Sequence, residues 1–221
     1  MVVQRSSEAF HATGLPTALL QGPVRVVTVQ SAVAVYAHPR AELARLAARG
    51  VLQRLHAGVY AVVPRGRAAA GWRPTLEAAA GALAVAAVGH DRAVLMGISA
   101  ARLHGAVPRA LGIATVAVPA QRRPVTLDGR SERVIFVPRN VERLDAELMD
   151  TDLGPLLVTG VEQTVLDLAH RPDRDGVGDE VRSAVAALMD RADAVVLAEL
   201  AAGQRLRTAL ARATAWTAAS R

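Results

Sequence analysis

Basic side chains recur at short intervals between residues 40 and 56. Arg45 and Arg49 are four residues apart, on the side of a predicted helix that faces away from its leucines, and Arg40 stands at the start of that helix. Arg54 and His56 follow in a predicted β-hairpin. A guanidinium can donate two parallel hydrogen bonds to guanine or to phosphate, so this pattern favours nucleic-acid binding. The alternative is a solvated helix face on which arginine is simply common.

The net charge of the chain is confined to the segment that carries these arginines. Residues 1–70 hold eight arginines and two glutamates, a net charge of +6, whereas residues 71–221 hold eighteen arginines and eighteen carboxylates. A segment with a large positive net charge, joined to one with no net charge, predicts two tasks on one chain. The basic segment is expected to face a polyanion. We therefore expect a DNA-binding domain over residues 1–70 and a second domain over residues 71–221.

Composition excludes several kinds of chemistry. The 221 residues include no cysteine and no lysine, which rules out disulfides, thiol nucleophiles, zinc thiolate sites, P-loop lysines and Schiff bases. The hydrophobic fraction of 52% is enough to bury a core, and no apolar run is long enough to span a bilayer. We expect a cytoplasmic protein that uses no metal and no cofactor.

Polar residues outside the basic segment have structural interpretations. Ser99 lies in Gly97-Ile98-Ser99-Ala100-Ala101, which lacks the last glycine of a nucleophile elbow, so it is interpreted as a helix-start residue. His104 is interpreted as a buried or capping histidine, because the histidines lack metal-ligand spacing. The carboxylates within residues 142–152 form either a solvated acidic face or a contact surface for a basic partner. No catalytic constellation remains, so we expect that the protein is not an enzyme.

The basic segment has the element order of a winged helix-turn-helix. Its predicted elements are helices over 5–22 (interrupted near 14–16), from 28 to 36 and over 39–48, then a hairpin of strands over 51–55 and 59–63. In a winged helix the third helix lies in the major groove and the hairpin touches the DNA backbone. This arrangement predicts that Arg54 and His56 meet phosphate.

Residues 64–71 are interpreted as a linker to a larger mixed α/β domain with a mostly helical C-terminus. Its predicted elements are helices over 75–88 and 97–103, strands over 113–118 and 156–158, a hairpin of 125–127 with 133–137, a helix through residues 165–168, and a mostly helical segment from Val177 onward. Thr159 and Glu162 have the spacing of a capping box for the helix through Leu166. The predicted fold class is α+β.

Three segments resemble the AbiEi-type antitoxins, which are transcriptional regulators of type IV toxin–antitoxin systems with an N-terminal winged helix. The segments are Arg40-x-Glu42-Leu43-x-Arg45-Leu46-x-x-Arg49-Gly50-Val51-Leu52-x-Arg54-Leu55-x-x-Gly58-Val59-Tyr60, Ser99-Ala100-Ala101-x-Leu103-His104-Gly105 and Val158-Thr159-Gly160-Val161-Glu162-Gln163-Thr164-Val165-Leu166-Asp167-Leu168-Ala169. The three in order are more specific than the first alone. One departure is Gly160, where relatives often carry serine.

The resemblance implies a transcriptional repressor that binds duplex DNA at repeats upstream of its own operon. It also implies that the C-terminal domain counters a cognate toxin of the nucleotidyltransferase type. Two alternatives stay open: a ligand-responsive transcription factor without a toxin, and a winged-helix accessory of a nucleic-acid-processing enzyme. A nucleotidyltransferase gene overlapping the end of this one would favour the antitoxin.

Overall fold

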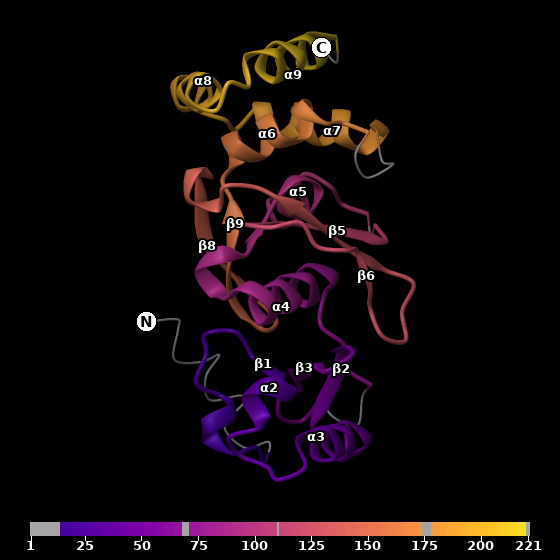
Figure 1. Ribbon diagram of the computed structural model, residues 1–221. Coiled ribbons are helices and arrows are strands. Elements are labelled where there is room, and N and C mark those ends of the chain that lie inside the picture. The colour runs from indigo at the N-terminus through magenta and orange to yellow at the C-terminus, as the bar shows by residue number, and fades with distance from the viewer. Residues whose placement is uncertain (1–13, 68–70, 110, 174–177, 220–221) are drawn as a thin grey trace.

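The computed structural model describes residues 14–67, 71–109, 111–173 and 178–219. Figure 1 shows a small sheet from residues 26–62 at one end of the molecule, a larger sheet in the middle, and the helices of residues 161–219 at the opposite end. The fold is mixed α+β, as predicted. The first part of the helix predicted over 5–22 lies outside the described residues, and residues 17–19 form a single 3-10 turn.

The N-terminal part is a three-stranded sheet with short helices on one side. Its elements are η1 (Thr17–Leu19), β1 (Val26–Thr28), α2 (Val29–Ala32), α3 (Pro39–Ala48), β2 (Leu52–His56) and β3 (Val59–Val62). All strand pairs are antiparallel, in the order β1-β3-β2. The predicted third helix and the hairpin are confirmed, whereas β1 was not predicted. The helix predicted to reach residue 36 ends at residue 32, where β-branched valines follow.

Helix α3 has local signals at both ends and an apolar side in between. Pro39 occupies its first turn, where the missing N–H has no intrahelical partner, and Gly50 follows its end at a φ of +73°. Leu43 and Leu46 are buried against the sheet in a core that includes Tyr60. Because these leucines face inward, the opposite side of α3 lies at the surface.

The second part is built on a six-stranded sheet. Its elements up to the last strand are α4 (Leu76–Val88), η3 (His90–Arg92), β4 (Val94–Leu95), α5 (Gly97–Leu103), β5 (Ile113–Val118), β6 (Val125–Thr126), β7 (Arg133–Pro138), η4 (Val141–Arg143), β8 (Ala146–Thr151) and β9 (Gly154–Thr159). The strand order is β6-β7-β5-β4-β9-β8, with parallel β5–β7 and β4–β9 pairs and antiparallel neighbours elsewhere. The predicted α4, α5, β5 and β6–β7 hairpin are confirmed; β4 and β8 were not predicted.

Helix α4 lies between the two sheets (Figure 1). Its buried residues are mostly alanine, and small side chains let a helix approach a sheet closely. The approach is closest at Gly81, where an added Cβ would lie 2.3 Å from Cδ1 of Leu156. Leu76 belongs to the same apolar core as Leu55 and Ala61 of the small sheet. One core therefore spans both parts of the chain.

The C-terminal region is helical, as predicted. It consists of α6 (Val161–His170), α7 (Gly178–Met189), α8 (Ala194–Gly203) and α9 (Arg207–Ala219), which share a second apolar core. The predicted capping box is wrong. The Thr159 hydroxyl pairs with that of Thr164 at 2.8 Å, and Glu162 accepts a hydrogen bond from the backbone N–H of Asp193 at 2.7 Å instead of capping its own helix. In the part of the chain that the structure describes, no helix is long and apolar enough to cross a membrane.

The junction between the two parts is closely packed. The N–H of Arg25 donates to the carbonyl of Leu153 at 2.7 Å, and the N–H of Asp128 donates to the carbonyl of Leu55 at 2.9 Å. Gly154, at a φ of +113°, leaves room for the Pro23 carbonyl, which a Cβ would approach to 2.3 Å. The domain boundary at residue 70 stays a prediction, and the two sides of it are in direct contact.

Candidate nucleic-acid interface

The exposed side of α3 carries three of the predicted DNA-binding residues. Arg40, Arg45 and Arg49 are all exposed. At 3.6 residues per turn, Arg45 and Arg49 lie on one edge of this side and Arg40 lies about half a turn from Arg49, on the other edge. Alanines 41, 44 and 48, also exposed, occupy the space between the two edges. The surface is therefore a small-residue strip flanked by guanidinium groups.

The three arginines differ in what holds them. Arg45 donates from Nε and Nη2 to Oε2 of Glu42, at 3.1 and 2.7 Å. The side chains of Arg40 and Arg49 have no hydrogen bond or ion pair with any residue that the structure describes. The Glu42–Arg45 pair is exposed, so it contributes about 0.2–1 kcal/mol and can be exchanged for another anion.

The two predicted hairpin residues lie in different surroundings. Arg54 is exposed on β2, and its Nε is 3.8 Å from Oδ2 of Asp128 in the turn that joins β6 to β7. It thus leans toward the second part of the molecule. His56 is half-buried at the end of β2, next to the turn at Gly58. The structure brings Arg45 and Arg49 together and leaves Arg54 beside a carboxylate.

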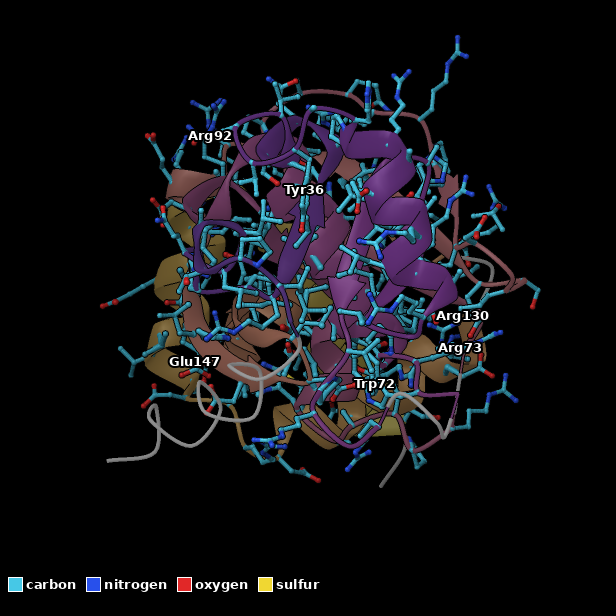
Figure 2. All side chains as sticks on the ribbon, turned by 90° about the horizontal axis from the view of Figure 1, so that it is seen from below. Tyr36, Trp72, Arg73, Arg92, Arg130 and Glu147 are labelled. Carbon is cyan, nitrogen blue, oxygen red and sulfur yellow. The ribbon has the colours of Figure 1, made fainter. Side chains whose placement is uncertain are left out.

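A second group of arginines near this end was not predicted. Arg73 Nη1 donates to the carbonyl of Gly129 at 3.0 Å, and Arg130 Nη1 donates to the carbonyl of Pro74 at 3.0 Å. Figure 2, which looks onto the N-terminal end, shows Arg73 and Arg130 side by side at one edge, next to Trp72. These arginines are held by the fold, and their positions depend on chain segments far apart in the sequence.

Ser99 and His104 have structural roles, in line with the sequence interpretation. Ser99 is fully buried, and its hydroxyl accepts the N–H of Thr115 at 2.8 Å. His104 ends α5, and its Nε2 pairs with the carbonyl of Thr159 at 2.8 Å. Two of the three sequence segments that resemble the antitoxins therefore meet in space. Among the described residues, no group of three or more His, Asp or Glu side chains could hold a metal ion.

Two buried polar clusters escaped the sequence analysis. Glu77, 3% exposed, lies 3.1 Å from Nη1 of Arg102. Burial raises the pKa of the Glu77 carboxyl, and the nearby Arg102 charge opposes this effect without cancelling it. In the other cluster Arg139 Nη1 donates to Oδ1 of Asp167 at 2.8 Å. The signal for the second cluster was Gln163, four residues before Asp167 and on the same side of α6.

The comparisons with known proteins concern both parts of the molecule. The protein has an α+β fold, in which a basic N-terminal part is joined to a mixed sheet and a layer of helices. The family model described as "AbiEi antitoxin C-terminal domain" matches residues 92–215, which is more than half of the chain. The chain belongs to the AbiEi antitoxin family, a regulatory class of proteins from toxin–antitoxin systems.

One solved structure extends the likeness to nearly the whole chain. The crystal structure of the RV2827C protein from Mycobacterium tuberculosis has a TM-score of 0.57 and 22% sequence identity, and the match covers 91% of this chain and 78% of that one. At this identity the likeness concerns the fold alone. A comparison with curated proteins gave no match.

Proposed function

We propose that this protein is the DNA-binding antitoxin and transcriptional autorepressor of a toxin–antitoxin operon. The observation that carries the proposal is the exposed arginine-flanked side of α3, within a segment of net charge +6 that is joined to an AbiEi antitoxin domain. The order β1-α2-α3-β2-β3 supports the winged helix-turn-helix proposed for this segment. In this proposal α3 enters the major groove and the β2–β3 turn lies on the phosphate backbone.

The two edges of α3 have different tasks in this proposal. Arg45 and Arg49 reach base edges or phosphates from one edge, and Arg40 contacts the backbone from the other. The alanines between them let the helix approach the floor of the groove. Arg45 must break its ion pair with Glu42 before it can contact DNA, whereas the Arg49 side chain has no such ion pair to break. Arg49 is therefore the stronger contributor.

The test is operator binding by the full-length protein, measured by fluorescence anisotropy on duplex DNA from upstream of the operon. Arg49→Ala is expected to weaken binding by about 1–3 kcal/mol if it reads guanine, with relaxed specificity at one base pair. Arg54→Ala should weaken binding to all sequences about equally, because a phosphate contact reads no base. Arg92→Ala is the matched control. Arg92 is exposed on η3, outside the residues proposed to contact DNA, and Figure 2 shows it at the opposite edge from Arg73.

Salt dependence checks the electrostatic basis separately. Four arginines in contact with phosphate predict a slope of log affinity against log salt near −3.6, since each contact contributes about −0.9. The corresponding loss between 50 and 200 mM salt is roughly 150-fold. A flat salt dependence, or an equal loss of affinity in Arg92→Ala, would overturn the DNA contact proposed here.

We further propose that the part after residue 70 counters a cognate toxin of the nucleotidyltransferase type. The match of the antitoxin family to residues 92–215 supports this assignment. Co-expression of the full chain with the neighbouring toxin gene should restore growth. If growth is not restored, the toxin assignment is wrong. The protein is then better explained as a ligand-responsive transcription factor without a toxin.

A further inference from the structure

A groove in the second part of the molecule takes no part in the proposed DNA contact. It crosses the C-terminal end of α6 and consists of two adjoining hollows, of about 630 and 520 Å³, that share His170 and Arg171 as lining residues. Arg212 and Trp216 of α9 line the first hollow. Arg139, at the end of β7, lines the second. Arg171 thus lines both hollows, with Arg212 in the first and Arg139 in the second.

Two of these arginines are fixed from behind. Nη1 of Arg139 donates to the buried carboxylate of Asp167 at 2.8 Å, and Nη1 of Arg212 donates to the carbonyl of Ala169 at 2.5 Å. A guanidinium has five N–H donors, so each keeps donors for a ligand while its position is set. Arg171 is exposed and has no hydrogen bond or ion pair with any described residue. The groove therefore combines two anchored cations with one that is available.

The lining chemistry favours a phosphate-bearing ligand with a flat ring. Asp173 is the one carboxylate among the lining residues that the structure describes in these hollows, against three arginines. Guanidinium groups bind phosphate oxygens in pairs, and planar bases stack on aromatic and guanidinium faces. Trp216 lines the same hollow as Arg212. Its ring is partly buried, and the Arg182 guanidinium lies over it, 5.9 Å from the centroid, so a base would meet the part of the ring that Arg182 leaves uncovered.

We propose that this groove binds a phosphorylated nucleoside, with the phosphates at Arg139 and Arg171 and the base beside Trp216. The ligand can be a free nucleotide or the phosphorylated end of an RNA, since both present the same groups. The proposal goes beyond the function proposed above, because it concerns residues distant from α3. DNA binding can fail without affecting it, and the reverse also holds.

The chain contains two tryptophans, so Trp72→Phe leaves Trp216 as the only indole reporter in the full-length protein. Adenosine triphosphate added to this variant should change the Trp216 fluorescence in a saturable way. Arg171→Ala, made in the same background, should raise the Kd by about tenfold or more, because it removes a charge-assisted contact. Arg92→Ala is the matched control and should leave the Kd unchanged.

Two further probes identify the ligand class. Inorganic triphosphate should bind more weakly than adenosine triphosphate, because it lacks the base; equal affinity would overturn the nucleoside assignment. An oligoribonucleotide with a 5′-triphosphate tests the RNA source, and tighter binding than the free nucleotide would assign the groove to chain ends. The proposal fails if no probe gives a saturable signal, or if Arg171→Ala binds as well as its parent.

Discussion

The ion pair between Glu77 and Arg102 allows a sharp test of the energetics at the centre of the fold. Glu77 is in the first turn of α4 with its side chain 4% exposed, and Arg102 of α5 is 20% exposed. Burial raises the pKa of Glu77 in spite of the adjacent Arg102. The ionised carboxylate is therefore a net cost to the folded state relative to the neutral one. Replacing it by a neutral isostere should be cheap, whereas removing its partner should not.

The two substitutions should therefore differ in size. Glu77→Gln keeps the shape and removes the charge, so we expect the free energy of unfolding at neutral pH to change by less than about 1 kcal/mol. Arg102→Ala leaves a buried carboxylate without its cation and should cost about 3 kcal/mol, the lower end of the usual range because Arg102 is partly exposed.

The pH dependence follows from the direction of the shift. Because the folded-state pKa of Glu77 is raised above the ordinary value of 4.5, its contribution to stability is full below 4.5 and is lost as the pH rises through the folded-state value. Wild type should therefore gain stability relative to Glu77→Gln as the pH is lowered. The cost of Arg102→Ala should shrink over the same interval, since a protonated Glu77 needs no cation.

Urea unfolding of the full chain at several pH values measures all four expectations. The wild type and the two variants are compared at each pH, so that other titrating groups cancel in the differences. If Glu77→Gln proves as destabilising as Arg102→Ala at neutral pH, the ionised pair is net stabilising. Burial would then cost the ionised Glu77 less than its pairing with Arg102 returns.

Two core substitutions, with Gly203→Ala as a control, test the packing, and two fragments test the division of tasks. Gly81→Ala should destabilise the fold by about 1–3 kcal/mol in thermal melts, because its Cβ meets Leu156, whereas Gly203→Ala on α8 has open space and should be neutral. Leu166→Ala empties a fully buried site and should cost about 2–5 kcal/mol; an unchanged melting temperature would show that α6 does not carry the core. Fragment 71–221 should restore growth without repressing the promoter, and should melt below the full chain because it exposes the face of α4 that covers the small sheet; rescue by fragment 1–70 alone would reverse this division of tasks.

The elements that were predicted correctly have strong local signals. Helix α3 follows from Pro39 and Gly50 at its ends, and strand β5 from an alternating run of β-branched residues. The missed strands lack such signals. Strand β4 has two residues and β1 has three, so their pairing depends on distant partners. Strand β8 lies at a sheet edge, where charged side chains are favoured, and its carboxylates were interpreted as part of a solvated acidic face or a contact surface.

Among the candidate sites, too, only the features that lie within one element could be predicted. The arginines of α3 could be assigned from helical spacing, because a helix places residues four apart on one edge. The approach of Asp128 to Arg54 could not, because it joins a strand of the small sheet to a turn more than seventy residues later. The groove at α6 also could not, because its two hollows are lined by residues from separate elements, Arg139 in one and Arg212 in the other. Sequence patterns identify surfaces that lie within one helix or strand. They do not identify surfaces formed by several elements.

The shared core determines where the two proposed activities can be separated. Leu55 and Ala61 of the small sheet and Leu76 of α4 belong to one cluster, so a substitution there alters the stability of both parts at once. Variants that separate DNA binding from toxin neutralisation must therefore lie on the surface. Arg49 of α3 meets this condition, since it is exposed and its side chain is not bonded to a described residue. A chain that carries Arg49→Ala should lose repression and keep its melting temperature, which no substitution within the α4 core can achieve.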